Sequence, residues 1–255
     1  MRVEYAPRGL IGVLTPQANT TVEPEMVVLS PPGVAFINGR LLSAKADMED
    51  RLVDYFDQLD QSVTQFANAP IEALAIACTG ASYLAGVARE RVTLKRLSER
   101  LGVPVFTAAS AVVDALRCLD AEEIGLVSPY PASLTESSIG YWEAQGFTVA
   151  AVATAETSGD NFHPIYSLPS EQARLGLERI ERRDLDAIVM LGTGMPTLRP
   201  ILDQPRLGTA PVMSCMLCLG WRSVIAVEKR PPGEANILEW VSGAEWGPRL
   251  AARLP

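Results

Sequence analysis

Short apolar runs and longer amphipathic stretches alternate along the chain. The apolar runs have the length of buried β-strands, and they lie at residues 10–14, 34–37, 73–77, 103–106, 124–127, 148–152, 187–191 and 211–213. Apolar positions recur every three to four residues in the stretches between them, which predicts helices near 47–68, 82–100, 108–119, 132–145, 170–183 and 215–227. This alternation predicts an α/β fold with mainly parallel sheets.

Turn and cap residues add two local expectations. Thr20 and Glu23, followed by Pro24, have the spacing of a capping box, so a helix is expected to start there with Glu23 as a capping group. The stretch after Arg230 contains Pro231, Pro232 and Gly233 and is interpreted as a packing appendage.

The chain also contains an internal repeat. The segment Gly-Val-Leu-Thr-Pro at 12–16 returns as Gly-Leu-Val-Ser-Pro at 125–129, and the strand end Cys-Thr-Gly at 78–80 returns as Gly-Thr-Gly at 192–194. Leu-Gly-Val-Pro-Val at 101–105 resembles Leu-Gly-Thr-Ala-Pro-Val at 207–212, in the same order. These matches predict two pseudosymmetric lobes, each with a four-stranded, mainly parallel sheet flanked by helices. The first lobe would comprise residues 1–110 plus 214–255, and the second would comprise 111–213.

The repeat also predicts where a ligand would bind. Ligands of open α/β sheets bind beyond the carboxyl ends of the strands, so the active site is expected in the cleft between the lobes. The residues that follow the strands at 15–19, 78–80, 128–130 and 192–194 would line it.

The composition of the chain disfavours two classes of binding partner, nucleic acids and anionic membranes. The chain has 255 residues, of which 48% are hydrophobic and 20% charged, and its formal net charge is −8. This acidic balance argues against broad binding to nucleic acid or to anionic membranes, because both require a basic face. The N-terminal segment lacks the features of a signal peptide, and no apolar run has the length of a membrane span, so the expected compartment is the cytoplasm.

Metal and disulfide chemistry are not indicated either. The chain has one histidine, His163, which has no partner at ligand spacing and is interpreted as structural. Its four cysteines are too few for a disulfide scaffold and are expected to be thiols.

Cys78 is the candidate nucleophile. It ends an apolar strand and opens a small-residue turn that leads into a helix, where free amide groups and the helix dipole are expected to lower its pKa and favour thiolate. The alternative interpretation is a small buried core residue. Its place at a strand end, repeated in the other half, favours the functional interpretation.

Other candidates can hold a carboxylate. Thr79 and Gly80, with Thr193 and Gly194 in the repeated turn, offer hydroxyls and backbone N–H groups that would converge from the two lobes without arginine or lysine. Ordinary strand-to-helix turns are the alternative. Asn19 is expected to direct an amide at the cleft or to form a turn.

These residues carry a family resemblance. The segments LIGVLTPQANTTVEPEM at 10–26, IACTGAS at 76–82, SPYPASL at 128–134, GDNF at 159–162 and GTGMPTLRPIL at 192–202 resemble maleate cis-trans isomerase. That family belongs, with arylmalonate decarboxylase, to the aspartate/glutamate racemase superfamily. The resemblance implies two pseudosymmetric lobes with the active site between them, no cofactor, and a homodimer.

The resemblance also implies residue roles. Cys78 matches the nucleophilic cysteine, and the groups that match dicarboxylate-binding positions are Asn19, Tyr130 and Asn161. Pro16, Thr79, Gly80, Thr193 and Gly194 are the further expected substrate contacts. The second cysteine of the two-thiol members matches Gly192, so this chain lacks a thiol there and racemisation is disfavoured. Water, Tyr130 or Cys215 would have to take over proton transfer.

The expected activity is therefore cofactor-independent cis-trans isomerisation of a small dicarboxylate, with the Cys78 thiolate adding to the double bond. A single-cysteine decarboxylase of the arylmalonate type, with Cys78 as proton donor, is the alternative. Its aromatic substrate would need an apolar pocket, for which Met195, Leu217 and Phe162 are candidates. A racemase-like or non-catalytic dicarboxylate-binding relative is a third possibility.

Overall fold

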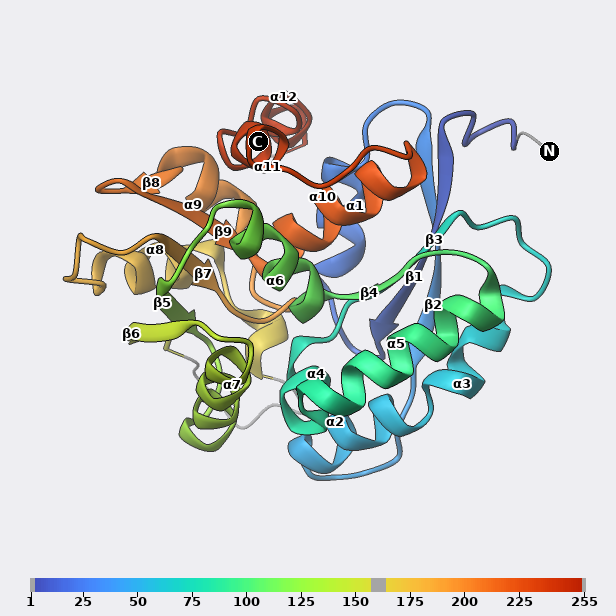
Figure 1. Ribbon diagram of the computed structural model, residues 1–255, viewed down its shortest axis with the longest axis horizontal. Helices are drawn as coiled ribbons and strands as arrows, with labels where there is room; N and C mark the ends of the chain where they lie inside the picture. Colours follow the sequence, from blue (N-terminus) through green and yellow to red (C-terminus); the bar gives the residue numbers. More distant parts are fainter. Residues whose placement is uncertain (1–2, 157–163, 254–255) are drawn as a thin grey trace.

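Two sheets lie side by side in the computed structural model, which describes residues 3–156 and 164–253 (Figure 1). The first sheet has the strand order β2-β1-β3-β4, and all its strand pairs are parallel. Its strands are β1 (Gly9–Pro16), β2 (Val34–Leu41), β3 (Ala73–Ile76) and β4 (Val105–Thr107). The prediction of an α/β fold with parallel sheets is confirmed.

The second sheet has the order β6-β5-β7-β9-β8. Its strands are β5 (Glu123–Ser128), β6 (Thr148–Thr154), β7 (Ala187–Met190), β8 (Arg206–Leu207) and β9 (Ala210–Ser214). β8 pairs antiparallel with β9 across a turn in which Gly208 has a φ of +63°. The prediction of four strands in this sheet is wrong, because it missed the edge strand β8. Two residues are too few to show the alternation of apolar and polar positions that marks a strand.

The two sheets repeat one strand order. The order β2-β1-β3-β4 corresponds, position by position, to β6-β5-β7-β9. The repeated glycine segments lie in β1 and β5, and the repeated turns at Cys78 and Gly192 follow β3 and β7. This agreement supports the predicted duplication. The lobe boundaries, 1–110 with 214–255 and 111–213, stay a prediction.

Local caps explain where several helices begin. The side chain of Asp47 accepts hydrogen bonds from the backbone N–H groups of Glu49 and Asp50 at the start of α2 (Met48–Asp57). Thr107 and Ser110 form a capping box at the start of α6 (Ala108–Cys118). The remaining helices in the predicted regions are α7 (Ala132–Ala144), α8 (Ser170–Glu178) and α10 (Cys215–Val227).

Two predicted helices are divided. The stretch 47–68 forms α2, α3 (Leu59–Ser62) and the 3-10 turn η1 (Val63–Phe66), because Gln58 leaves helical geometry while the apolar spacing continues past it. The stretch 82–100 forms α4 (Thr79–Ala85) and α5 (Val87–Leu101). They part at Gly86, whose φ of +76° lies in the region that favours glycine.

Other helices lie outside the predicted ranges. They are α1 (Val22–Leu29), η2 (Pro164–Ser167), α9 (Leu198–Asp203), α11 (Glu234–Val241) and α12 (Gly247–Ala251). α1 buries most of its surface, so it has no apolar stripe with a helical period. The appendage after Arg230 forms α11, which packs against α10 and α6, and α12, which packs against α1 and α9.

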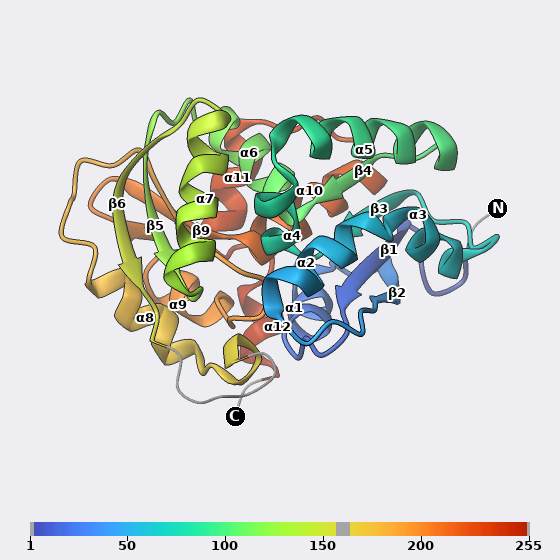
Figure 2. The same cartoon turned by 90° about the horizontal axis from the view of Figure 1, so that it is seen from below.

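α10 holds the two sheets together. It contacts β1, β3 and β4 of the first sheet and β9 of the second, and it packs against α6 and α1. Figures 1 and 2 show it in the middle of the molecule, between the two sheets. Because nearly all its residues are buried, α10 forms the centre of the core that both lobes share. None of the helices that the structure describes is both long and apolar enough to cross a membrane.

Gly220→Ala in α10 is expected to lower the free energy of unfolding by about 1–3 kcal/mol. A Cβ at Gly220 would lie 2.6 Å from Cδ1 and 2.9 Å from Cβ of Leu29, so α1 and α10 would have to separate. Urea unfolding measures the loss. Gly140→Ala in α7 is the matched control, because no atom lies within 4 Å of the added Cβ, and it is expected to gain up to about 1 kcal/mol. Equal losses in both variants would contradict this packing argument.

Candidate active site

The carboxyl ends of four strands meet at one small cavity of about 20 Å³. Predicted residues from both lobes line it: Pro16, Cys78, Thr79, Gly80, Tyr130 and Thr193. They follow β1, β3, β5 and β7, the equivalent strands of the two sheets. The predicted cleft between the lobes therefore exists, and it has room for about one water molecule.

Cys78 lies at the start of α4, as predicted, but its surroundings differ from the expectation. It is the N-cap residue of α4 and only 4% exposed. Burial raises the pKa of its thiol to about 12, and an interaction with the backbone of Ala81 opposes this shift only in part. The expectation of a lowered pKa is therefore wrong for this closed site, because the loss of water outweighs the helix terminus.

Asn19 joins the two lobes. Its Oδ1 accepts hydrogen bonds from the backbone N–H groups of Thr21 (2.8 Å) and Val22 (3.0 Å), so it satisfies two amides at the start of α1, where Thr21 is the N-cap residue. Its Nδ2 donates to Oγ1 of Thr193 at 3.4 Å, and that hydroxyl donates to the carbonyl of Ala77 at 2.8 Å. One buried side chain thus connects the start of α1 with turns that follow β3 and β7.

The capping box predicted at Thr20 and Glu23 does not form. The side chain of Asn19 binds amides at the start of α1 instead, while Thr20 donates to the backbone carbonyl of Tyr166 and Glu23 pairs with Arg40. The hydroxyl of Thr21 donates to the carbonyl of Gly194 at 2.7 Å. Gly194 therefore contributes to the junction between the lobes and does not line the cavity.

Tyr130 and Thr79 meet across the cavity. Their hydroxyls are 2.7 Å apart, and both side chains are buried. Burial raises the pKa of Tyr130 well above its ordinary value. A neutral phenol beside a threonine hydroxyl can donate a hydrogen bond to a carboxylate, or a proton to a developing carbanion.

Gly192 cannot be replaced by cysteine without strain. Its φ is +82°, and a Cβ built there would lie 3.1 Å from Cγ of Pro129 and 3.3 Å from the hydroxyl of Tyr130. The hydroxyl of Tyr130 therefore lies where a side chain at position 192 would begin.

The apolar wall comes from residues that the sequence pattern did not single out as site residues. Met48 and Leu52 of α2, with Ile165 and Tyr166 of η2, complete the lining. Among the earlier candidates for an apolar pocket, Met195 and Leu217 are fully buried elsewhere in the core. Asn161 and Phe162 lie outside the described residues. The sequence pattern predicted the apolar face of α2, but only the folded structure shows that this face lies against the strand ends.

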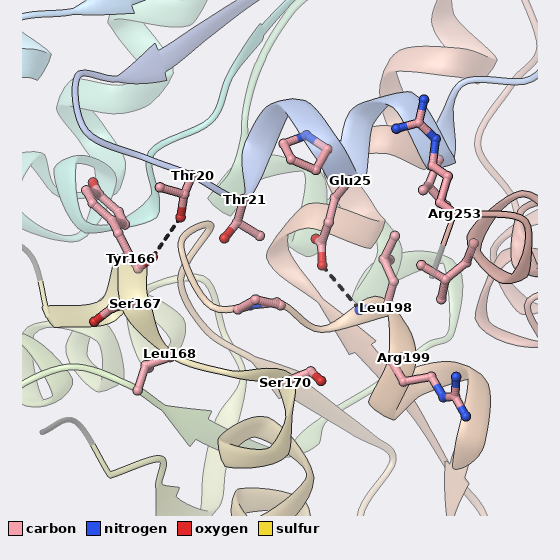
Figure 3. A pocket seen from close by; sticks show the side chains of 14 residues that line it. Thr20, Thr21, Glu25, Tyr166, Ser167, Leu168, Ser170, Leu198, Arg199 and Arg253 are labelled. Atoms are coloured by element: carbon pink, nitrogen blue, oxygen red, sulfur yellow. Dashed lines mark hydrogen bonds between the residues drawn. The ribbon is translucent and has the colours of Figure 1, made fainter. Parts of the chain in front are cut away.

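A second cavity of about 440 Å³ shares Tyr166 with the smaller one, and Figure 3 shows the residues that line it. Glu25 reaches into its wall, where Oε1 accepts hydrogen bonds from the backbone N–H groups of Thr197 (2.8 Å) and Leu198 (3.3 Å). Burial raises the pKa of Glu25 to about 7. No cysteine lines this cavity, so the smaller one is the candidate active site.

Within residues 3–156 and 164–253, no group of three or more His, Cys, Asp or Glu side chains is arranged to hold a metal ion. The groups at the candidate site are a thiol, hydroxyls and backbone N–H groups.

A family model decides the relationship. The model for arylmalonate decarboxylase matches residues 11–238. The chain belongs to the arylmalonate decarboxylase family. Within the curated proteins it is similar to "Maleate isomerase" of Nocardia farcinica, with 29% identity over 213 residues that cover 80% of this chain and 84% of that protein.

Solved structures show the same fold. A cysteine mutant of the maleate isomerase Iso from Pseudomonas putida S16, with maleate, has a TM-score of 0.80 at 24% identity and covers 92% of this chain and 98% of its own. A cysteine mutant of Nocardia farcinica maleate cis-trans isomerase with a covalently bound succinylcysteine intermediate has a TM-score of 0.78 at 25% identity, covering 91% and 98%. The relatives of this chain thus include an isomerase that has been solved with a covalent intermediate on a cysteine.

Alkylation of Cys78 by iodoacetamide is expected to be slow near neutral pH and to accelerate about tenfold per pH unit from about pH 7 to about pH 10. With a pKa of about 12, the thiolate is a small fraction that grows with pH throughout this range. Peptide mass spectrometry measures labelling at Cys78, with the Cys118→Ala variant removing the half-buried thiol. A plateau below about pH 8 would show instead a lowered pKa.

Proposed function

We propose that this protein is a cofactor-independent cis-trans isomerase of a small dicarboxylate such as maleate, with Cys78 as the nucleophile. The observation that carries the proposal is the position of Cys78. It is the thiol that lines the cavity where the equivalent strand ends of the two sheets meet, opposite Tyr130 and Thr193. The isomerases among its relatives support the same activity.

The reaction needs one covalent adduct. The sulfur of the Cys78 thiolate forms a bond to one alkene carbon, and the π electrons move to the neighbouring carbon, which takes a proton. The former double bond is then a single bond and rotates. Loss of a proton from the neighbouring carbon re-forms the double bond and expels the thiolate, which releases the trans product.

Dipoles can hold the two carboxylates, and one buried cation near the cavity favours their negative charge from a distance. The turns at Thr79 and Thr193 offer hydroxyls and backbone N–H groups from the two lobes. Burial raises the pKa of Tyr166 in the cavity wall well above its ordinary value, and the charge of Arg51, a residue of α2 that is only 2% exposed, opposes this shift in part. This positive charge favours an anionic substrate without contacting the cavity directly.

The substrate requires more room than the cavity provides. About 20 Å³ holds about one water molecule, whereas a dicarboxylate is several times larger. Binding must therefore move the wall that Met48, Leu52, Ile165 and Tyr166 form. When the substrate enters, it displaces this wall and places its polar groups next to Cys78. This lowers the desolvation of the sulfur and favours the thiolate that addition requires.

A decarboxylase is the second candidate. Its cysteine must be protonated, because the thiol gives a proton to the enediolate that remains after carbon dioxide leaves. The raised pKa of Cys78, about 12, favours this protonated form. The same site thus suits thiolate addition only once the substrate has changed the surroundings of Cys78.

A homodimer and a location in the cytoplasm remain predictions from the sequence.

Proton NMR with maleate and, in a parallel tube, phenylmalonate separates the two functions. Fumarate is expected from maleate, and Cys78→Ala is expected to lower its rate at least about 10³-fold. Cys118→Ala, at a half-buried thiol away from the site, is the control and is expected to keep the wild-type rate. Phenylacetate from phenylmalonate, with maleate unchanged, would establish the decarboxylase. Silence in both tubes would overturn both proposals.

Asn19→Asp is expected to leave folding nearly intact and to lower the isomerisation rate about 10²-fold or more. The carboxylate keeps an oxygen acceptor at the start of α1, so the backbone N–H groups of Thr21 and Val22 stay satisfied. It removes the Nδ2 donor and adds negative charge beside Thr193, which repels a dicarboxylate. Steady-state kinetics with thermal unfolding measure both effects. An active Asp variant would contradict a role for this amide in binding.

A further inference from the structure

Cys215 is a buried thiol next to the candidate active site that the proposed mechanism leaves unused. It is the first residue of α10 and is fully buried. Ser214 pairs in register with Met190 across β9 and β7, so Cys215 lies beside the end of β7, where the turn at Gly192 begins. This placement puts a second thiol at a strand end of the second sheet.

The polar surroundings of Cys215 are those that stabilise a thiolate. Its sulfur interacts with the backbone of Gly192 and with the hydroxyls of Tyr83 and Thr79, and each of these interactions lowers its pKa. Burial outweighs them and raises the pKa to about 12. The sulfur also lies at the N-terminus of a thirteen-residue helix, whose dipole favours negative charge. The neutral thiol is therefore the resting form, but a transient thiolate would have donors around it.

Tyr83 provides a second reason to expect that a negative charge at Cys215 would be stabilised. Its side chain is 5% exposed, and its hydroxyl interacts with the hydroxyl of Thr79 and the sulfur of Cys215, but it makes no hydrogen bond of good geometry among the described residues. The ring is held by edge contacts with Tyr130 and Trp142, with centroids 6.2 and 5.7 Å away. A buried hydroxyl that lacks a strong acceptor lowers the stability of the folded state. A thiolate at Cys215 would supply that acceptor.

Thr79 connects this thiol with the cavity. Its hydroxyl interacts with Cys215 and lies 2.7 Å from the hydroxyl of Tyr130. Tyr130 lines the cavity beside Cys78. Thiol, threonine and phenol thus form a continuous line of exchangeable protons from the buried start of α10 to the substrate space.

We propose that Tyr130, Thr79 and Cys215 form a proton relay that protonates the substrate carbon next to the one bound by Cys78, and takes the proton back before the product leaves. The proposal rests on the isomerase function proposed above. In it Tyr130 is a catalytic residue, because it meets the reacting carbon. Thr79 and Cys215 act through Tyr130 and are positioning residues of the relay.

Before the relay acts, the thiol of Cys78 gives its own proton to solvent water as the substrate enters, and it regains a proton when the product leaves. The relay step itself then balances without another reactant. As the bond from the sulfur of Cys78 forms, the electron pair on the neighbouring carbon takes the proton of the Tyr130 hydroxyl. The phenolate oxygen takes the proton of Thr79, and Thr79 takes that of Cys215, which becomes a thiolate. Elimination reverses every transfer. The negative charge rests at Cys215 because a thiol is ordinarily a stronger acid than a phenol or an aliphatic alcohol.

Two substitutions at Cys215 test the relay against a packing role. Cys215→Ala removes the acid, and Cys215→Ser keeps a side chain of similar shape with a much weaker acid. Cys218→Ala is the matched control, because Cys218 is equally buried one turn later in α10. Isomerisation of maleate is measured as kcat and KM in mixtures of H₂O and D₂O, and thermal unfolding is followed in parallel.

Both Cys215 variants are expected to lose about 10²-fold in kcat with little change in KM, while Cys218→Ala stays near wild type. The plot of wild-type rate against D₂O fraction is expected to curve, since several protons move, and to become linear without Cys215. Rates of both variants within about twofold of wild type would overturn the relay, and so would a wild-type rate in Cys215→Ser alone. A loss of rate with an unchanged D₂O plot would mark a packing effect and overturn it too.

The same experiment separates the relay from the function on which it rests. A wild-type protein that converts maleate, with Cys215 variants that match it, refutes the relay and leaves the isomerase standing. A wild-type protein that leaves maleate unchanged refutes both.

Discussion

The convergence of parallel strand ends is the constraint on which the site depends. All strands of the first sheet are parallel, as are four of the second, so each lobe presents its turns and helix N-termini at one edge. The two edges face each other, and polar groups of one lobe satisfy those of the other. Asn19 accepts from amides at the start of α1 and also donates to Thr193, whose hydroxyl donates to the carbonyl of Ala77. The cavity at Cys78 is what remains between edges joined in this way.

Exclusion of water from this junction sets the chemistry. Burial raises the pKa values of Cys78 and Cys215 to about 12 and that of Tyr130 far above its ordinary value. In the closed site each group therefore holds its proton. Charge can appear there only when a substrate supplies counter-groups or when a proton moves between neighbours.

Much of the fold could be predicted because its signals are local. Strand-length apolar runs, glycine turns and the internal repeat correctly predicted two mainly parallel sheets, and the equivalent strand orders of these sheets support the predicted duplication. The errors occur where the apolar spacing along the chain does not report the element boundaries. Gln58 and Gly86 divide helices whose apolar spacing continues across the break. The buried helix α1 shows no stripe, and β8 is too short for any period.

At the site, the sequence by itself determined which turns would meet, since Cys78, Thr79, Tyr130 and Thr193 all follow equivalent strands. It could not determine the protonation of Cys78, because the number of atoms that exclude water from a thiol depends on distant segments such as α2 and η2. Nor could it connect Cys215 with Thr79, which are far apart in the chain and meet only when α10 packs between the sheets. Spacing along a chain reports local geometry, whereas desolvation and contact across lobes arise only from packing.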